Sequence, residues 1–91
     1  MEYMTIRWID PPDGEPELMF LELDPQRCEV RKVEMFPDGT SSRTDADHLS
    51  GRTWLAEGPL PQIDEIGEMG PFEPAIISRE EFEEAWQRAT Y

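Results

Sequence analysis

The only histidine of the chain lies in Asp45-Ala46-Asp47-His48, where two carboxylates and an imidazole stand close together. Side chains of these types bind metal ions, and an imidazole can also exchange protons near neutral pH. The surrounding residues are polar, and nothing downstream supplies a matching set of ligands. The pattern therefore favours a solvated loop, and we expect no metal site.

Cys28 is the second candidate for chemistry, because a thiol beside His48 could act as a nucleophile with its base. No third group to orient the imidazole is indicated, and Cys28 lies within a strand-like run, so we expect a buried and inert thiol. A single cysteine also excludes an intramolecular disulfide. Phosphate-binding glycine motifs and nucleophile elbows are absent from the sequence, so we expect neither a cofactor nor an enzymatic activity.

Carboxylates are so abundant that no single pair of them indicates an acid–base site. The chain has 21 acidic and 8 basic residues, for a net charge of −13. Direct binding to nucleic acid or to an anionic membrane needs a basic face, which this composition disfavours. A basic protein partner is favoured, because long-range attraction speeds its association. The other interpretation is that the acidity only keeps a small protein soluble.

Short elements must position these side chains, and the stretch 27–39 is the most strand-like of them because it is rich in β-branched and aromatic residues. We predict an α+β domain: an antiparallel, meander-like sheet of four to five strands with a C-terminal helix packed on one face. The chain is expected to form one domain, 1–91, in which 1–56 is mainly β, 57–76 is irregular with a short helix, and 78–90 is the C-terminal helix. The expected strands are 3–9, 17–23, 27–36, 40–44 and 52–56.

Alternation and capping signals support these assignments. Met4, Ile6 and Trp8 share one face of the first strand. The central strand changes its alternation near Arg31-Lys32, which predicts a β-bulge there, and its charged residues are expected to form cross-strand ion pairs with Arg7 or Glu22. In the last segment Ser78 and Glu81 form a capping box. The stripe that follows, which should pack on the sheet, consists of Phe82, Ala85, Trp86 and Ala89.

Several blocks of the sequence together resemble a family of small bacterial single-domain proteins of unknown function. The most specific block is Glu29-Val30-Arg31-Lys32-Val33-Glu34 within 27–34. The others are Glu2-Tyr3-Met4, Arg7-Trp8, Glu22-Leu23-Asp24, Asp38-Gly39, Leu60-Pro61, Glu65-Ile66, Phe72-Glu73-Pro74 and Ile77-Ser78 with Phe82 and Trp86. The resemblance covers nearly the whole chain and implies a bacterial, stand-alone domain, but it supplies no catalytic residues.

The leading functional hypothesis is a non-enzymatic acidic protein-binding domain, most concretely an immunity or inhibitor protein that neutralises a basic partner such as a nuclease-type toxin. The expected contact residues are Asp45, Asp47, Glu57, Asp64, Glu65, Glu68, Glu80, Glu83 and Glu84. One alternative is a small ligand-binding domain or enzyme that uses the open sheet face with Arg7, Arg31 and His48. Another is a DNA-mimic inhibitor of a nucleic-acid-binding protein. The N-terminus lacks signal-peptide features and no apolar run reaches membrane-spanning length, so we expect a cytoplasmic protein.

Overall fold

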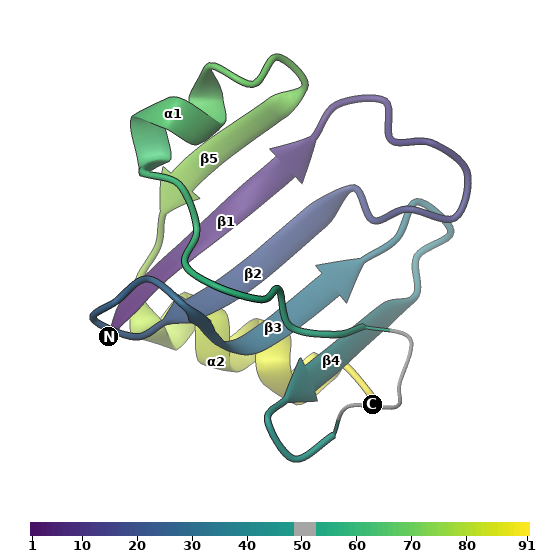
Figure 1. Cartoon of the computed structure of the whole chain (residues 1–91). Helices are drawn as coiled ribbons and strands as arrows, with labels where there is room; N and C mark the ends of the chain where they lie inside the picture. The colour runs from purple at the N-terminus through teal and green to yellow at the C-terminus, as the bar shows by residue number, and fades with distance from the viewer. Residues whose placement is uncertain (49–52) are drawn as a thin grey trace.

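The computed structural model describes residues 1–48 and 53–91. It contains one antiparallel sheet with a helix on each of its two faces (Figure 1). The elements are β1 (Glu2–Trp8), β2 (Leu18–Leu23), β3 (Glu29–Met35), β4 (Ser41–Asp45), α1 (Ile63–Gly67), β5 (Phe72–Ile76) and α2 (Arg79–Arg88). This confirms the predicted α+β fold with an antiparallel sheet and a C-terminal helix.

The strand order is β4-β3-β2-β1-β5. The first four strands form the predicted meander, but the fifth strand is not the expected one. Phe72–Ile76, predicted to be irregular, pairs with β1 and forms one edge of the sheet. Pro74 is tolerated in this edge strand. It lies opposite Ile6 in a pair that exchanges no backbone hydrogen bonds, so an N–H at this position would point away from β1 and none is lost from the ladder.

The prediction of a strand at 52–56 was wrong for the residues that the structure describes. Thr53–Ala56 pairs with no strand and instead crosses the face of the sheet (Figure 1), whereas Arg52 lies outside the described residues. Two glutamates of β3 hold this segment: Thr53 Oγ1 donates to Glu34 Oε1 at 2.8 Å, and the Ala56 N–H donates to Glu29 Oε1 at 2.7 Å. The segment is therefore held by hydrogen bonds to side chains, where the prediction expected backbone hydrogen bonds to a neighbouring strand.

The predicted bulge in β3 is present one residue before Arg31. Glu22 pairs with Arg31 and Leu23 pairs with Glu29, which leaves Val30 as the extra residue. The strand is shorter than predicted, because it begins at Glu29. The prediction of a buried Cys28 within the strand was wrong, since Cys28 lies in the connection before β3 and is only partly buried.

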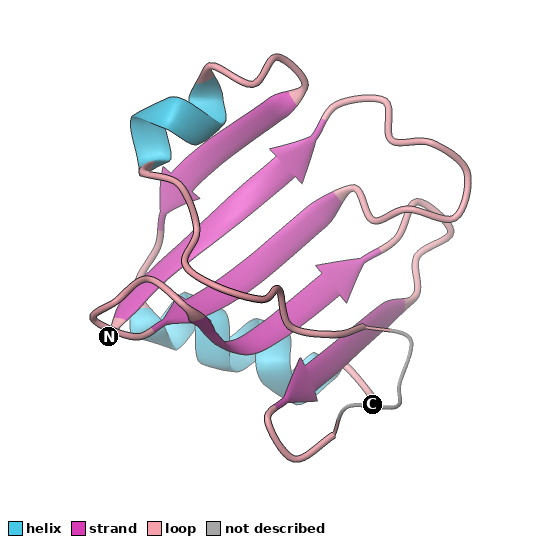
Figure 2. Ribbon diagram, viewed as in Figure 1, coloured by secondary structure: helices cyan, strands magenta, loops and turns pink. Residues whose placement is uncertain are grey.

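The aliphatic core lies on the face that α1 covers. Met4, Ile6, Leu21, Leu23 and Ile66 form one buried cluster, so the predicted inward face of β1 is confirmed. The thin cover over this core consists of α1 and the loop that runs from Thr53 to Pro61, shown in front of the sheet in Figure 2.

The opposite face carries α2 (Figure 2). Ser78 and Glu81 form the predicted capping box at its start, and Phe82 is completely buried against the sheet. The helix ends earlier than predicted, at Arg88, because Ala89 is extended. Thr90 then bridges to Ser42 and covers the outer edge of β4.

Candidate protein-interaction surface

Arg31 is enclosed between α2 and the sheet. Its guanidinium bonds to both carboxylate oxygens of Glu22, at 2.6 and 3.0 Å, and pairs with Glu83. It also lies over the rings of Phe82 and Trp86, 4.8 and 4.9 Å from their centroids. The hydrogen bonds from Arg31 lower the pKa of Glu22, and the two carboxylates raise the pKa of Arg31. The predicted cross-strand ion pair with Glu22 is therefore confirmed.

Arg43 and Arg27 are also used inside the fold. Arg43 lies over the rings of Trp86 and Tyr91, at 4.7 and 4.6 Å, and donates to the Trp86 carbonyl oxygen. Arg27 pairs with Glu2 at 2.6 Å. Both arginines are thus taken up by internal contacts, as Arg31 is.

Lys32 completes this set, because its ammonium lies 3.4 Å from Glu29 Oε1 and its side chain is largely buried. Within residues 1–48 and 53–91, the basic side chains that are exposed are Arg7, Arg79 and Arg88. The fold therefore uses about half of the positive charge internally.

Most carboxylates, in contrast, face solvent. The exposed acids outside the capping box and with no ion pair among the described residues are Asp10, Asp13, Glu15, Glu17, Asp47, Glu57, Asp64, Glu65, Glu68, Glu73, Glu80 and Glu84. The surface is consequently more one-sidedly acidic than the composition alone implies.

The acids named from the sequence do not form one patch. Asp64 and Glu65 lie on α1 and Glu68 is the C-cap of that helix, whereas Glu80 and Glu84 lie on α2, across the sheet. Glu57 and Asp47 are exposed in connecting segments. A single partner of ordinary size would contact only some of them.

Asp45 and Glu83 differ from the other predicted contact residues because both have internal partners. Glu83 pairs with Arg31.

Asp45 bonds to His48 Nδ1 at 2.8 Å and accepts from the Tyr91 hydroxyl at 3.0 Å, while His48 stacks on Tyr91 with ring centroids 3.8 Å apart. The bond to His48 lowers the pKa of Asp45. Burial, followed by the Asp45 carboxylate, raises the pKa of Tyr91. These contacts join residues 45–48 to the C-terminal residue Tyr91. The described residues include no group of three or more side chains placed to hold a metal ion.

Arg7, Arg31 and His48, named for a small ligand, do not converge. Arg7 lies opposite Leu18 at one end of β2, and Arg31 lies opposite Glu22 at the other end. His48 bonds to Asp45 beyond the end of β4. No common pocket brings the three side chains together among the described residues.

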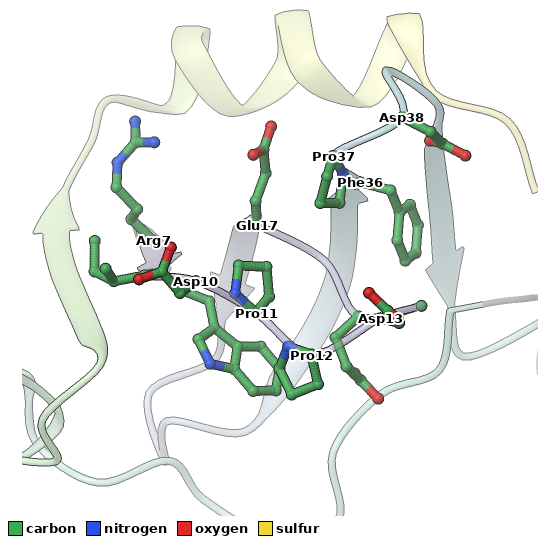
Figure 3. A pocket seen from close by; sticks show the side chains of 13 residues that line it. Arg7, Asp10, Pro11, Pro12, Asp13, Glu17, Phe36, Pro37 and Asp38 are labelled. Carbon is green, nitrogen blue, oxygen red and sulfur yellow. The ribbon is translucent and has the colours of Figure 1, made fainter.

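The loop between β1 and β2 carries acids that sequence reasoning missed. It lines an open cleft of about 610 Å³ together with the turn between β3 and β4. Figure 3 shows Asp10, Asp13 and Glu17 around this cleft. The loop is held by hydrogen bonds of 2.9 Å from the Trp8 N–H to the Glu17 carbonyl and from the Glu17 N–H to Met35. The sequence analysis names none of these acids as a contact residue, and their density between the prolines is the signal that could have found them.

The chain is thus an α+β domain. It has an open antiparallel sheet with a helix on each face, and its exterior is acidic. The family described as "Domain of unknown function (DUF6881)" matches residues 2–91, and the chain belongs to that family. No curated protein and no solved structure gives a significant match. None of the helices in the described part of the chain has the length and apolar character needed to cross a membrane.

Proposed function

We propose that this domain binds a basic protein partner through its acidic surface and performs no catalysis itself. The most concrete form of the proposal is an immunity or inhibitor protein that neutralises a basic partner such as a nuclease-type toxin. The observation that supports it is the unequal use of charge: Arg27, Arg31, Lys32 and Arg43 are engaged within the fold, while the exposed acids named above form no ion pair within residues 1–48 and 53–91.

Charge of this kind acts at a distance. An acidic surface raises the rate at which a basic partner arrives, and the effect weakens over a Debye length of roughly 8 Å at physiological salt. Carboxylates can also occupy a site that a partner built for phosphates, because both groups accept hydrogen bonds from arginine. A nuclease is therefore a suitable class of target. A partner that binds nucleic acid without cutting it would be recognised by the same physics, as the DNA-mimic alternative requires.

The test is affinity capture from a lysate of the source organism, using the whole chain as bait at about 50 mM and about 500 mM NaCl, where screening differs strongly. We expect a basic protein that is retained at the lower salt and weakened at the higher. The captured protein is then purified and assayed on nucleic acid with and without the chain. Loss of a nuclease activity would support an immunity function, and loss of nucleic-acid binding alone would support the DNA-mimic form.

The matched comparison uses two triple variants with the same change of charge. One neutralises three acids of α1 and its C-cap (Asp64→Asn, Glu65→Gln, Glu68→Gln) and the other neutralises three acids of the β1–β2 loop (Asp13→Asn, Glu15→Gln, Glu17→Gln). At least one of them should slow association with the purified partner. Capture that is equal at both salts, or no captured basic protein at either, would contradict the proposal.

A further inference from the structure

Trp54 is the most exposed large hydrophobic side chain among the described residues, with 68% of its surface accessible. It belongs to the segment that crosses the α1 face of the sheet. Thr53 before it is fully buried and Leu55 after it is partly buried, whereas the indole itself faces outward. Indoles are enriched among the residues that dominate binding energy at protein interfaces.

The backbone that carries Trp54 is fixed on both sides. Thr53 is bonded to Glu34 and Ala56 is bonded to Glu29, both on β3. Further along, the Leu60 N–H donates to the Arg27 carbonyl at 2.9 Å. A side chain presented on such a backbone loses little freedom when a partner covers it, which favours binding.

Carboxylates accompany the indole. Trp54, Glu15 and Glu34 line one cleft of about 230 Å³, to which Lys32 and Phe36 also contribute. Lys32 is paired with Glu29, and Glu34 accepts from Thr53, whereas Glu15 is exposed. Asp13, which lines the neighbouring cleft, adds a further negative charge to the same loop (Figure 3). The cleft thus combines an open aromatic face with an exposed acid.

The same combination holds one arginine inside the protein. Arg31 lies over Phe82 and Trp86 while it bonds to Glu22 and Glu83. Among residues 1–48 and 53–91, the stacked arginines lie over Phe82, Trp86 and Tyr91, and none lies over the ring of Trp54. The outer cleft therefore has the aromatic and acidic parts of an arginine site and lacks a described guanidinium.

We propose that Trp54 and Glu15 bind an arginine side chain of the basic partner, with the guanidinium flat on the indole and paired with the carboxylate. This inference rests on the proposed function and specifies where the partner makes its central contact. Arginine suits the site better than lysine, because a planar guanidinium can stack on an aromatic face and pair with a carboxylate at once.

The experiment uses the whole ¹⁵N-labelled chain and two probes of equal charge, a tri-arginine peptide and a tri-lysine peptide, at low salt. The indole N–H signal of Trp54, assigned with Trp54→Phe, should shift during the tri-arginine titration more than the signals of Trp8 and Trp86. Tri-arginine should bind about threefold more tightly than tri-lysine, and Trp54→Ala should weaken tri-arginine about fivefold. Glu15→Gln should weaken it about two- to threefold, and Glu84→Gln, an equal change of charge on α2, should leave it unaltered.

Two results would overturn the inference, and they differ in what else they imply. If tri-arginine binds and Trp54→Ala has no effect, the arginine site is wrong while a basic partner still suits the acidic surface. If neither peptide shifts any signal at low salt, the arginine site fails and the proposed function fails with it. Because Trp54 is exposed, its variants should unfold at the wild-type denaturant midpoint, so a loss of binding would not reflect a loss of fold.

Discussion

The two faces of the sheet are closed by different means. Under α1 lies an aliphatic cluster that includes Met4 and Leu21, and its cover is a short helix with an irregular segment tied to β3. Under α2 the contacts are aromatic and ionic, with Phe82 buried and Arg31 held between carboxylates. The cluster under α1 is stabilised by the burial of apolar side chains, whereas the contacts under α2 also include ion pairs and an arginine stacked on aromatic rings.

The two faces show two ways in which a covering segment is held on a sheet. A helix with a regular apolar stripe, such as α2, can seat on a sheet by its own periodicity. The segment from Thr53 to Pro61 has no such stripe, and polar side chains of β3 hold it in place. We therefore expect changes of volume in the aliphatic cluster to have the largest effect on the α1 face, and removal of the Arg31 charge to have the largest effect on the α2 face, where the lowered pKa of Glu22 adds a dependence on pH.

The largest effect is expected for Phe82→Ala. Phe82 is fully buried, its ring centroid lies 5.6 Å from that of Tyr3, and it supports Arg31. Its truncation should lower the free energy of unfolding by roughly 3–5 kcal/mol, against roughly 2–5 kcal/mol for Leu21→Ala on the other face. Urea unfolding followed by circular dichroism measures both. A Phe82→Ala loss below about 1 kcal/mol would show that α2 is not anchored as described.

The second largest loss of unfolding free energy is expected for Arg31→Met. This change removes the charge of the side chain and keeps much of its volume. It leaves the buried Glu22 with the Tyr3 hydroxyl, at 2.8 Å, as its remaining hydrogen-bond donor on the α2 face. Because the site is partly open to solvent, we expect a loss of roughly 1–3 kcal/mol. Adding Glu22→Gln should recover part of it, as a double-mutant cycle from urea unfolding would show. Purely additive losses would mean that the two residues do not interact.

The pH dependence of stability provides a third test. The folded state holds the pKa of Glu22 below its ordinary value of 4.5, so near and below that pH the unfolded chain binds more protons. The stabilisation is complete above the unfolded pKa and is lost as the pH falls through the folded one. Glu22→Gln should flatten the unfolding free energy against pH below 4.5. Leu21→Ala should lower the whole curve and keep its slope, and an equal flattening in both variants would contradict the contrast between the faces.

The smallest effect is expected for Thr53→Val, which keeps the shape of the side chain and removes its hydrogen bond to Glu34. A loss of about 1 kcal/mol should follow. Hydrogen exchange at the Ala56 amide should speed up, while exchange in α2 is unchanged. Accelerated exchange in α2 as well would show that the covers on the two faces are coupled.

Local patterns were enough to predict much of this fold. Alternation in β1 places Met4 and Ile6 inside, and the capping box marks the start of α2, because both signals depend on neighbours in the sequence. The pairing of Phe72–Ile76 with β1 joins segments far apart in the chain, and Pro74 argued against a strand until its place at an edge was known.

The candidate surface was less predictable, because it too depends on contacts between segments that are far apart in the chain. The pair of Arg31 with Glu22 follows from strand alternation, but its contact with Glu83 depends on how α2 lies across the sheet. The sequence predicts a strand at 52–56, in which the indole of Trp54 is expected to be covered. Its exposure became visible only once Thr53–Ala56 was found to cross the sheet without pairing.

The strand order also bears on the time course of folding. The four-strand meander brings together neighbours in sequence, but the edge of β1 that faces β5 must wait for residues 72–76. Contacts of such separation are slow to form, because a long loop must close first. Until they form, β1 presents unpaired backbone groups, and a neighbouring chain can compete for them. The last strand to join the sheet therefore also removes the site at which misassembly could begin.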